Sequence, residues 1–505
     1  MKIAQKLTVL LLACGFFESC LAADQYWGYQ YKQFSVTAQG NADFARTLAH
    51  NLYRLDLSIA AVLQTKGSQW HPHIDVYAVP GELFSAFSGQ SADSGSISKV
   101  TPLSSTFLIN TSQSPENRYW STYFAFGTSV LGTSYSFRYP SWFTAGLAEV
   151  FAASTVEYRK VTIGGANKGR VYTLSTGTWI PIQTLLTVRG GDPQFSSHAF
   201  LEIYYSETWY LVHKIVIDQF YHANFYQYFL RLDQGEDEQK AFAGSFDMSY
   251  EELDKALKKS ITTDKFMRLT VTVPDEDDGV KPVRLNEAES KARLARYAAE
   301  HGVQPEKGLE LSSAALKLDP GNEDAKIARL RAEARAANPD AASRDADEVC
   351  TGATLSSNVT AACALVFRSL AGKVSDKSAQ AELRDKARKF YDQTVQLEPG
   401  DLQSWYGLSR LVLDTHDVSD AKTFVPKFQT VQSAHPDVGI LASSVAALYS
   451  LAGDESNAMK YALVWHSRSI NNIDRANAAA YISRLKDARD RKQAAAGISP
   501  AEAQP

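Results

Sequence analysis

One stretch decides how the first half of the chain is interpreted: Tyr139-Pro140-Ser141-Trp142-Phe143-Thr144-Ala145-Gly146-Leu147-Ala148-Glu149-Val150-Phe151. Its apolar content predicts a helix over residues 141–153, and a second aromatic helix is predicted over 119–131, on the other side of Arg138-Tyr139-Pro140. Two helices this rich in aromatic side chains are expected to form part of a buried core.

Strand and helix signals alternate around these two helices. Short runs of β-branched and aromatic residues predict strands at 33–36, 74–79, 105–110, 156–163 and 169–174. Apolar residues at helical spacing predict helices at 42–63, 197–216 and 249–260, the last with Ser249 as N-cap and Glu252 three residues on. This alternation predicts an α+β domain over residues 23–270.

The composition of the 505-residue chain changes near residue 280. Six of the eight tryptophans precede this point, whereas the 221 residues after 284 contain 42 alanines, a bias that favours helices. Residues 271–286 are acidic and contain two prolines, which predicts an exposed linker between two domains. Residues 491–505 are small and polar without periodicity and are predicted to be a disordered tail.

Residues 287–490 contain a repeated pattern. Leu318-Asp319-Pro320-Gly321 recurs 79 residues later as Leu397-Glu398-Pro399-Gly400. Within one unit, small, aromatic, small and proline positions are occupied by Ala387, Tyr391, Thr394 and Pro399. This pattern resembles tetratricopeptide repeats, which are helix pairs with a period of about 34 residues. The resemblance implies an all-α helical repeat domain that binds a protein or peptide partner; the alternative is a helical bundle without repeats.

The N-terminus predicts export. A basic start, an apolar run over 7–17 and small residues before Asp24 are typical of a signal peptide over 1–22, cleaved after Ala22 or Ala23. The apolar run is shorter than the about 20 residues that span a bilayer, so no membrane span is expected. Lipid attachment at Cys14, in Leu11-Leu12-Ala13-Cys14, is the alternative. The protein is therefore expected in the periplasm or outside the cell.

Two cysteines remain after such cleavage, Cys350 and Cys363. An even pair in an oxidising compartment predicts a disulfide, the alternative being two buried thiols. The formal net charge of −4 and the charged fraction of 21% argue against a nucleic-acid-binding protein and against global disorder.

The stretch over 139–151 resembles the second active-site helix of gluzincins, zinc-dependent peptidases of the MA clan. Two later stretches strengthen the resemblance: Gly177-Thr178-Trp179-Ile180-Pro181-Ile182 and Tyr205-Ser206-Glu207-Thr208-Trp209-Tyr210-Leu211-Val212-His213. In that family H-E-x-x-H on the preceding helix supplies two histidine ligands and the general base, and a glutamate on the second helix is the third ligand. The resemblance covers residues 30–262 and implies a zincin-like α+β fold.

The sequence departs from the family at the catalytic positions. The resemblance places Phe126 and Val130 at the two histidines, Gly127 at the general base and Ala145 at the third ligand; Glu149 is retained. No shift of register supplies a histidine, because none lies between 73 and 198. Zinc needs at least three nitrogen, sulfur or oxygen ligands, at about 2 Å. We therefore expect no bound metal, no cofactor and no catalytic residue.

Other histidines are weaker metal candidates. His71 and His73 precede a strand and are expected in a surface turn, His198 and Glu202 form a pair on a helix surface, and His213 is expected to be a core histidine.

Three functions remain open from the sequence. The leading hypothesis is an exported pseudopeptidase that binds a protein or peptide through its repeats and its vestigial cleft. A hydrolase that uses other residues, such as carboxylates or His213, is the alternative. In a third hypothesis the first domain serves only as packing for the repeats.

Overall fold

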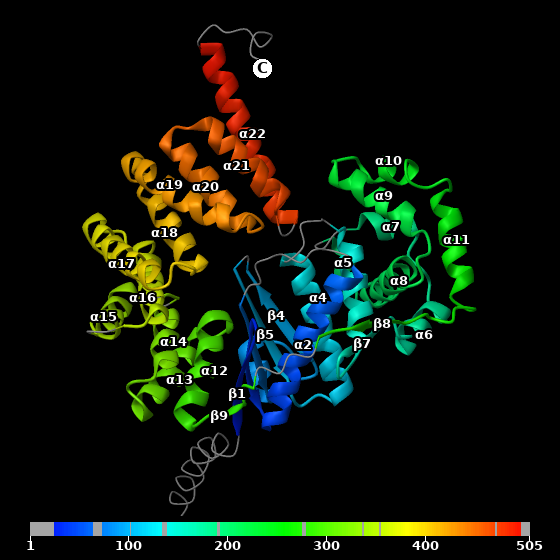
Figure 1. Ribbon diagram of the computed structural model, residues 1–505, viewed down its shortest axis with the longest axis horizontal. Helices are drawn as coiled ribbons and strands as arrows, with labels where there is room; N and C mark the ends of the chain where they lie inside the picture. The colour runs from blue at the N-terminus through cyan, green and yellow to red at the C-terminus, as the bar shows by residue number, and fades with distance from the viewer. Residues whose placement is uncertain are drawn as a thin grey trace, which may run out of the picture.

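The computed structural model describes residues 25–63, 73–101, 103–133, 139–188, 192–274, 279–335, 338–352, 355–469 and 472–495. Ala22, Ala23, Cys14 and His71 lie outside these residues. In the described part of the chain, no helix combines the length and apolar character that crossing a bilayer requires. An α/β region with a mixed sheet is followed by an array of helices that runs from α12 (Glu287–His301) to α22 (Asn472–Ala495). The array curves from the side of strand β9 (Val283–Arg284) toward α5 (Ser141–Ala152) (Figure 1).

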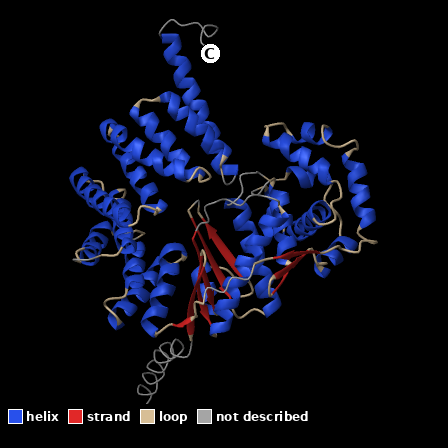
Figure 2. Cartoon of the chain, viewed as in Figure 1, coloured by secondary structure: helices blue, strands red, loops and turns tan. Residues whose placement is uncertain are grey.

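A six-stranded mixed sheet forms the centre of the α/β region (Figure 2). Its order is β4-β5-β3-β2-β1-β9, and the strands β2, β3 and β5 run parallel while the others pair antiparallel. The strands are β1 (Tyr26–Tyr31), β2 (Phe34–Gln39), β3 (His73–Val79), β4 (Ser96–Val100), β5 (Ser104–Asn110) and β9 (Val283–Arg284). The predictions at 33–36, 74–79 and 105–110 correspond to β2, β3 and β5.

Both faces of this sheet are buried. Alternate residues of β3 point to opposite sides: Ile74, Val76 and Ala78 join one hydrophobic cluster, and Tyr77 and Val79 join another. The first cluster includes the helices α2 (Ala42–Val62) and α4 (Pro115–Thr133). The second is completed by α3 (Gly81–Ser88) and by α12 (Glu287–His301), the first helix of the array.

Helices and a small sheet complete the α/β region. In α5 (Ser141–Ala152), a Cβ at Gly146 would lie 2.1 Å from the carbonyl oxygen of Thr208 in α8 (His198–Val216), so glycine permits the close approach of these helices. Ser249 and Glu252 form the predicted capping box at the start of α11 (Tyr250–Ser260). The remaining elements are β6 (Thr155–Glu157), β7 (Lys160–Ile163), β8 (Leu269–Thr272), α6 (Lys168–Thr176), α7 (Ile182–Thr187), the 3-10 turn Pro193–Ser196, α9 (His222–Asp233), α10 (Glu238–Ala243) and α11 (Tyr250–Ser260).

Alternate helices pack on one another along the array. Each of α12, α14, α16 and α18 contacts the next even-numbered helix, and the odd-numbered helices lie beside them as second members of helix pairs. At Gly407 a Cβ would lie 2.4 Å from the ring of Tyr391, so the small residue lets α17 approach α18. The helices are α13 (Pro305–Leu318), α14 (Glu323–Glu333), α15 (Pro339–Cys350), α16 (Ser357–Ala371), α17 (Lys377–Leu397), α18 (Leu402–Thr415), α19 (Val418–Ala434), α20 (Gly439–Ala452), α21 (Glu455–Ser467) and α22 (Asn472–Ala495).

The predicted disulfide is confirmed. Cys350, at the end of α15, is bonded to Cys363 in α16. Both cysteines are buried in the hydrophobic cluster of the array. The bond closes a short loop, a constraint that restricts the unfolded chain and stabilises the fold by about 3 kcal/mol in the chain-entropy model.

Three predicted segments differ from the structure. Both ends of the predicted linker 271–286 belong to sheets: β8 pairs with β7, and β9 pairs with β1. The physical reason is that β7 and β1 each have an edge whose backbone groups can bond to a further strand. Helix α22 continues through 491–495, the start of the predicted tail, where Ala494 and Ala495 favour helix. The predicted strand 169–174 is helix α6, because Asn167 caps it by accepting from the backbone N–H of Arg170.

We expect Tyr297→Ala in α12 to destabilise the whole molecule by about 3–5 kcal/mol, the cost of removing a large core ring. The Tyr297 ring is buried, with its centroid 5.4 Å from that of Tyr77 and 5.6 Å from that of Phe87. Chemical denaturation followed by fluorescence measures the change. Tyr158→Ala, at an exposed tyrosine, is the matched control and should change stability by less than about 0.5 kcal/mol. Equal effects of the two substitutions would contradict the role of α12 as cover for the sheet.

Candidate functional site

The two positions aligned with zinc-ligating histidines lie in the hydrophobic core. Phe126 is fully buried, and its ring centroid lies 5.8 Å from that of Phe34 and 6.0 Å from that of Phe107. Val130, one turn further along α4, is buried in the same cluster. Both side chains therefore pack toward the sheet and have the environment of ordinary core residues.

The remaining aligned positions lie at the contact between α4 and α5. A Cβ at Gly127 would lie 3.3 Å from the Cα of Ala148, so Gly127 contributes close packing between the helices. Ala145 is half-buried, and Glu149, one turn beyond it, is 1% exposed. Of the five residues singled out by the resemblance, only Glu149 carries a charged group, and its carboxylate is buried.

Glu149 is paired with an arginine from another helix. Nη2 of Arg170, in α6, lies 2.5 Å from Oε1 of Glu149, and Nε lies 3.3 Å from Oε2. Burial raises the pKa of Glu149 above its ordinary value, and the charge and hydrogen bonds of Arg170 oppose that shift. This two-point contact supplies the positive charge and the donors that a buried carboxylate requires.

A row of aromatic side chains adjoins this ion pair. The guanidinium carbon of Arg170 lies 5.8 Å from the ring centroid of Tyr205, which meets Phe124 edge-on at 5.7 Å. Phe124 stacks on Trp120, one turn earlier in α4, at 5.7 Å. All four side chains are partly exposed. We call Trp120, Phe124, Tyr205 and Arg170 the aromatic–arginine surface.

A second buried carboxylate connects the two later stretches that carry the family resemblance. Oε1 of Glu207, in α8, accepts the backbone N–H of Ile180 at 2.5 Å. Burial raises the pKa of Glu207 to about 8, although the hydrogen bond from Ile180 lowers it. At neutral pH this carboxyl is therefore mostly protonated. Its position, 3% exposed and bonded to the chain before α7, is that of a structural group.

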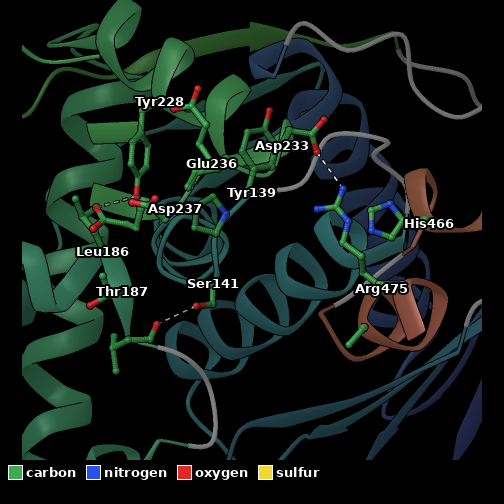
Figure 3. Close-up of a pocket in the computed structure, with 16 residues that line it drawn as sticks. Tyr139, Ser141, Leu186, Thr187, Tyr228, Asp233, Glu236, Asp237, His466 and Arg475 are labelled. Carbon is green, nitrogen blue, oxygen red and sulfur yellow. Dashed lines mark hydrogen bonds and ion pairs between the residues drawn. The ribbon is translucent and has the colours of Figure 1, made fainter. Parts of the chain in front are cut away.

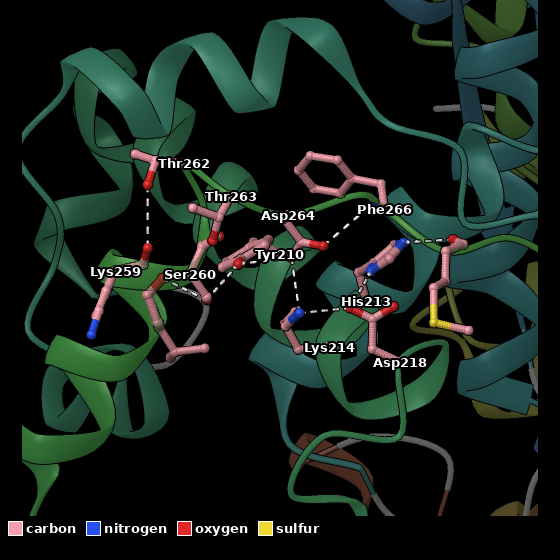
Figure 4. Close-up of polar contacts among 12 residues, drawn as sticks. Tyr210, His213, Lys214, Asp218, Lys259, Ser260, Thr262, Thr263, Asp264 and Phe266 are labelled. Atoms are coloured by element: carbon pink, nitrogen blue, oxygen red, sulfur yellow. Dashed lines mark hydrogen bonds and ion pairs between the residues drawn. The ribbon is translucent and has the colours of Figure 1, made fainter.

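His213 belongs to a buried polar network at the end of α8 (Figure 4). Its Nε2 lies 2.9 Å from the carbonyl oxygen of Gly164 and 3.1 Å from that of Met267. The neighbouring Lys214 donates to Asp218 at 2.7 Å and to Asp264 at 2.9 Å. These contacts connect α8 to the residue after β7 and to the segment before β8. His213 is therefore a core histidine with a structural role.

The other histidine candidates are separate from this network. His73 is 52% exposed, and its Nε2 lies 3.2 Å from Asp75. Glu202 accepts a hydrogen bond from Thr173 at 3.2 Å, while His198 is exposed at the start of α8. Across the described residues, no three His, Cys, Asp or Glu side chains are grouped as a metal site requires.

Sequence reasoning missed Arg170, the partner of Glu149. Arg170 lies in the segment 169–174, which was predicted to be a strand, and nothing in that prediction connected it to Glu149. A signal was present, because asparagine three residues before Arg170 is a favoured helix N-cap. That signal predicts the helix that begins at Lys168, whereas the contact of Arg170 with Glu149 comes from the packing of this helix against α5.

We expect Arg170→Met to lower the free energy of unfolding by about 3 kcal/mol near pH 7, because it leaves a buried carboxylate without its counterion. The loss should shrink as pH falls toward the ordinary carboxyl pKa, because the raised pKa of Glu149 leaves the carboxyl mostly protonated there in the folded parent and in the folded variant. The double variant Glu149→Gln/Arg170→Met should regain most of it. Denaturant titrations at several pH values test this, and additive effects of the two substitutions would show that the pair is not coupled.

We expect Glu207 to make stability depend on pH. Its folded pKa of about 8 lies above the unfolded value, so the folded state holds a proton that the unfolded state releases. Stability is therefore full below the unfolded pKa and falls as pH rises toward 8, by up to about 1.4 kcal/mol per pH unit. Glu207→Gln should remove this slope. Glu251→Gln, at an exposed glutamate, should leave it unchanged, and a slope that persists in Glu207→Gln would refute the assignment.

No protein-family model, curated protein or solved structure matches the chain.

Proposed function

We propose that the protein is an exported, non-catalytic binding protein, a zincin-like domain without catalytic residues followed by tetratricopeptide-like repeats. The observation that carries the proposal is the pairing of Glu149 with Arg170. In a gluzincin the equivalent region holds a zinc ion with three ligands, whereas here a fixed guanidinium meets the one carboxylate that remains. A carboxylate already held by two hydrogen bonds is poorly placed to act as a base on a substrate.

The aromatic–arginine surface is the part of the α/β region that we propose contacts the ligand. Tryptophan, tyrosine and arginine side chains dominate the energetics of protein interfaces, because they bury large areas and retain a polar group. Here Trp120, Phe124 and Tyr205 are partly exposed beside Arg170, and the exposed Thr128 lies one turn beyond Phe124. An extended peptide with apolar side chains fits this combination, because the charge of Arg170 is already paired with Glu149.

The array supports the proposal through its packing order. Helix pairs in which alternate helices stack are the arrangement that gives repeat proteins an extended binding face. Tyr391, Thr394 and Ala387, which carry the repeat resemblance, are buried between helices, as the pattern requires. The disulfide between α15 and α16 is compatible with the oxidising compartments to which exported proteins are delivered.

The hydrolase alternative requires an accessible acid or base. Glu149 and Glu207 are the acidic groups near the motif whose pKa burial raises, a feature of catalytic carboxylates. Glu149 is held by Arg170, and Glu207 is bonded to the backbone of Ile180, so both groups have structural partners.

We expect the mature full-length protein to select peptides from a displayed random library and to hydrolyse none of a quenched fluorescent peptide library, with or without added zinc. Trp120→Ala should lower the affinity for the selected peptides by at least about tenfold, which is the effect of removing one large side chain from the centre of an interface. Tyr158→Ala, at an exposed tyrosine, is the control and should bind normally. Hydrolysis that is lost in Glu149→Gln would instead identify an enzyme, and binding unaffected by Trp120→Ala would exclude this surface.

A further inference from the structure

A cavity of about 550 Å³ lies where the last helix of the array meets the α/β region (Figure 3). One wall comes from α21 and α22, with His466, Arg475 and Ala476. The facing wall comes from the start of α5, from α7 and from α9 and α10, and includes Tyr139 and Tyr228. The volume is in the range of small-molecule sites, about 300–1,000 Å³.

Most acidic groups in the cavity wall have a cationic partner within this chain. Three carboxylates are matched in this way: Asp233 pairs with Arg475 at 3.3 Å, Glu236 with Arg231 at 3.1 Å, and Asp237 with Lys240 at 2.8 Å. The first pair joins α9 to α22 across the cavity (Figure 3). The fourth carboxylate of the wall belongs to Glu238.

Glu238 has hydrogen-bond donors but no cation. Its Oε1 accepts from the hydroxyl of Tyr228 at 3.3 Å, and its Oε2 accepts from that of Tyr250 at 3.0 Å. Within the described residues, Glu238 forms no ion pair. Burial and the neighbouring Asp237 raise the pKa of Glu238, as expected for a carboxylate that lacks a counterion. The two phenols fix its position while leaving its charge uncompensated.

We propose that this cavity binds a small organic cation, a primary ammonium or a guanidinium, with Glu238 as its counterion and the Tyr139 and Tyr228 side chains beside it. A cation in a partly enclosed site gains from an unpaired carboxylate and from aromatic rings. The apolar part of the wall, which includes Leu186 and Leu232, suits the methylene chain of such a ligand.

The chemistry of the wall argues against other ligand classes. An anion would face four carboxylates against Arg475 and His466, and Arg475 is already paired. A hard divalent cation needs about six oxygen ligands, and the described residues contain no group of three potential metal-binding side chains. An organic cation needs only one counterion and an apolar surface for its chain.

Isothermal titration of the mature full-length protein with putrescine, agmatine and N-acetyl-lysine methylamide tests the proposal. We expect one site per chain for at least one of these cations, an affinity that falls with added salt, and no binding of 1,4-butanediol, the neutral analogue of putrescine. Binding of putrescine or agmatine without the lysine derivative assigns the site to free amines or guanidines, and the reverse assigns it to side chains of a peptide. Failure of all three cations to bind overturns the proposal.

Variants locate the site within the chain. Glu238→Gln keeps an acceptor for both phenols and should weaken the cation at least tenfold, whereas Glu251→Gln, at an exposed glutamate of α11, should leave affinity unchanged. Ala476→Trp places an indole ring in the cavity from the α22 wall and should abolish binding. This second variant tests the site even if Glu238→Gln does not fold. Trp120→Ala, in the surface proposed for peptides, should not affect cation binding. Affinity unchanged in a folded Glu238→Gln or in Ala476→Trp overturns the assignment.

Discussion

The central sheet has two apolar faces, and both must be covered for the α/β region to fold. Strand residues alternate between the faces, and helices α2 and α4 cover one of them. On the other face α3 spans only eight residues, and α12, the first helix of the array, supplies Leu294, Tyr297 and Ala298 to complete the layer. The array is therefore part of the core of the α/β region, and strand β9, which precedes α12, fixes its entry by pairing with β1.

This shared core has a consequence for the rest of the array. Because α12 is held against the sheet, the directions of α14, α16, α18 and α20 follow from the successive packing of these alternate helices, and α22 packs on α21. The array returns to the α/β region at α22, where Arg475 meets Asp233. The first junction is apolar and buried, whereas this second junction is polar and encloses a cavity, so the two contacts differ in strength. A ligand in that cavity would touch both parts of the chain.

Charge compensation distinguishes the candidate sites. A carboxylate that is fully or partly removed from water is stabilised by a counterion, by hydrogen bonds or by a proton, and this chain contains all three arrangements. Glu149 has a guanidinium, Glu238 has two phenols, and Glu207 has a raised pKa of about 8 together with one backbone donor. Glu149, neutralised by a guanidinium, and Glu207, neutralised by a proton at neutral pH, have structural roles. Glu238, which has hydrogen bonds only, supports a ligand site.

The sequence by itself determined the local structure and its chemistry. Helical spacing, strand composition and capping residues predicted three strands of the central sheet, β2, β3 and β5, because these signals act within a few residues. The same signals predicted the helices α2, α4, α5, α8 and α11. The even pair of cysteines and the predicted oxidising compartment predicted the disulfide, which the structure contains. Only the tertiary structure decided which residues meet: Arg170 reaches Glu149 from a helix predicted as a strand, and the linker predicted from its charge ends in strands that pair with distant edges. The physical reason is that a counterion or a free strand edge is supplied by a segment far away in the chain, and such pairings leave no periodic pattern in the sequence.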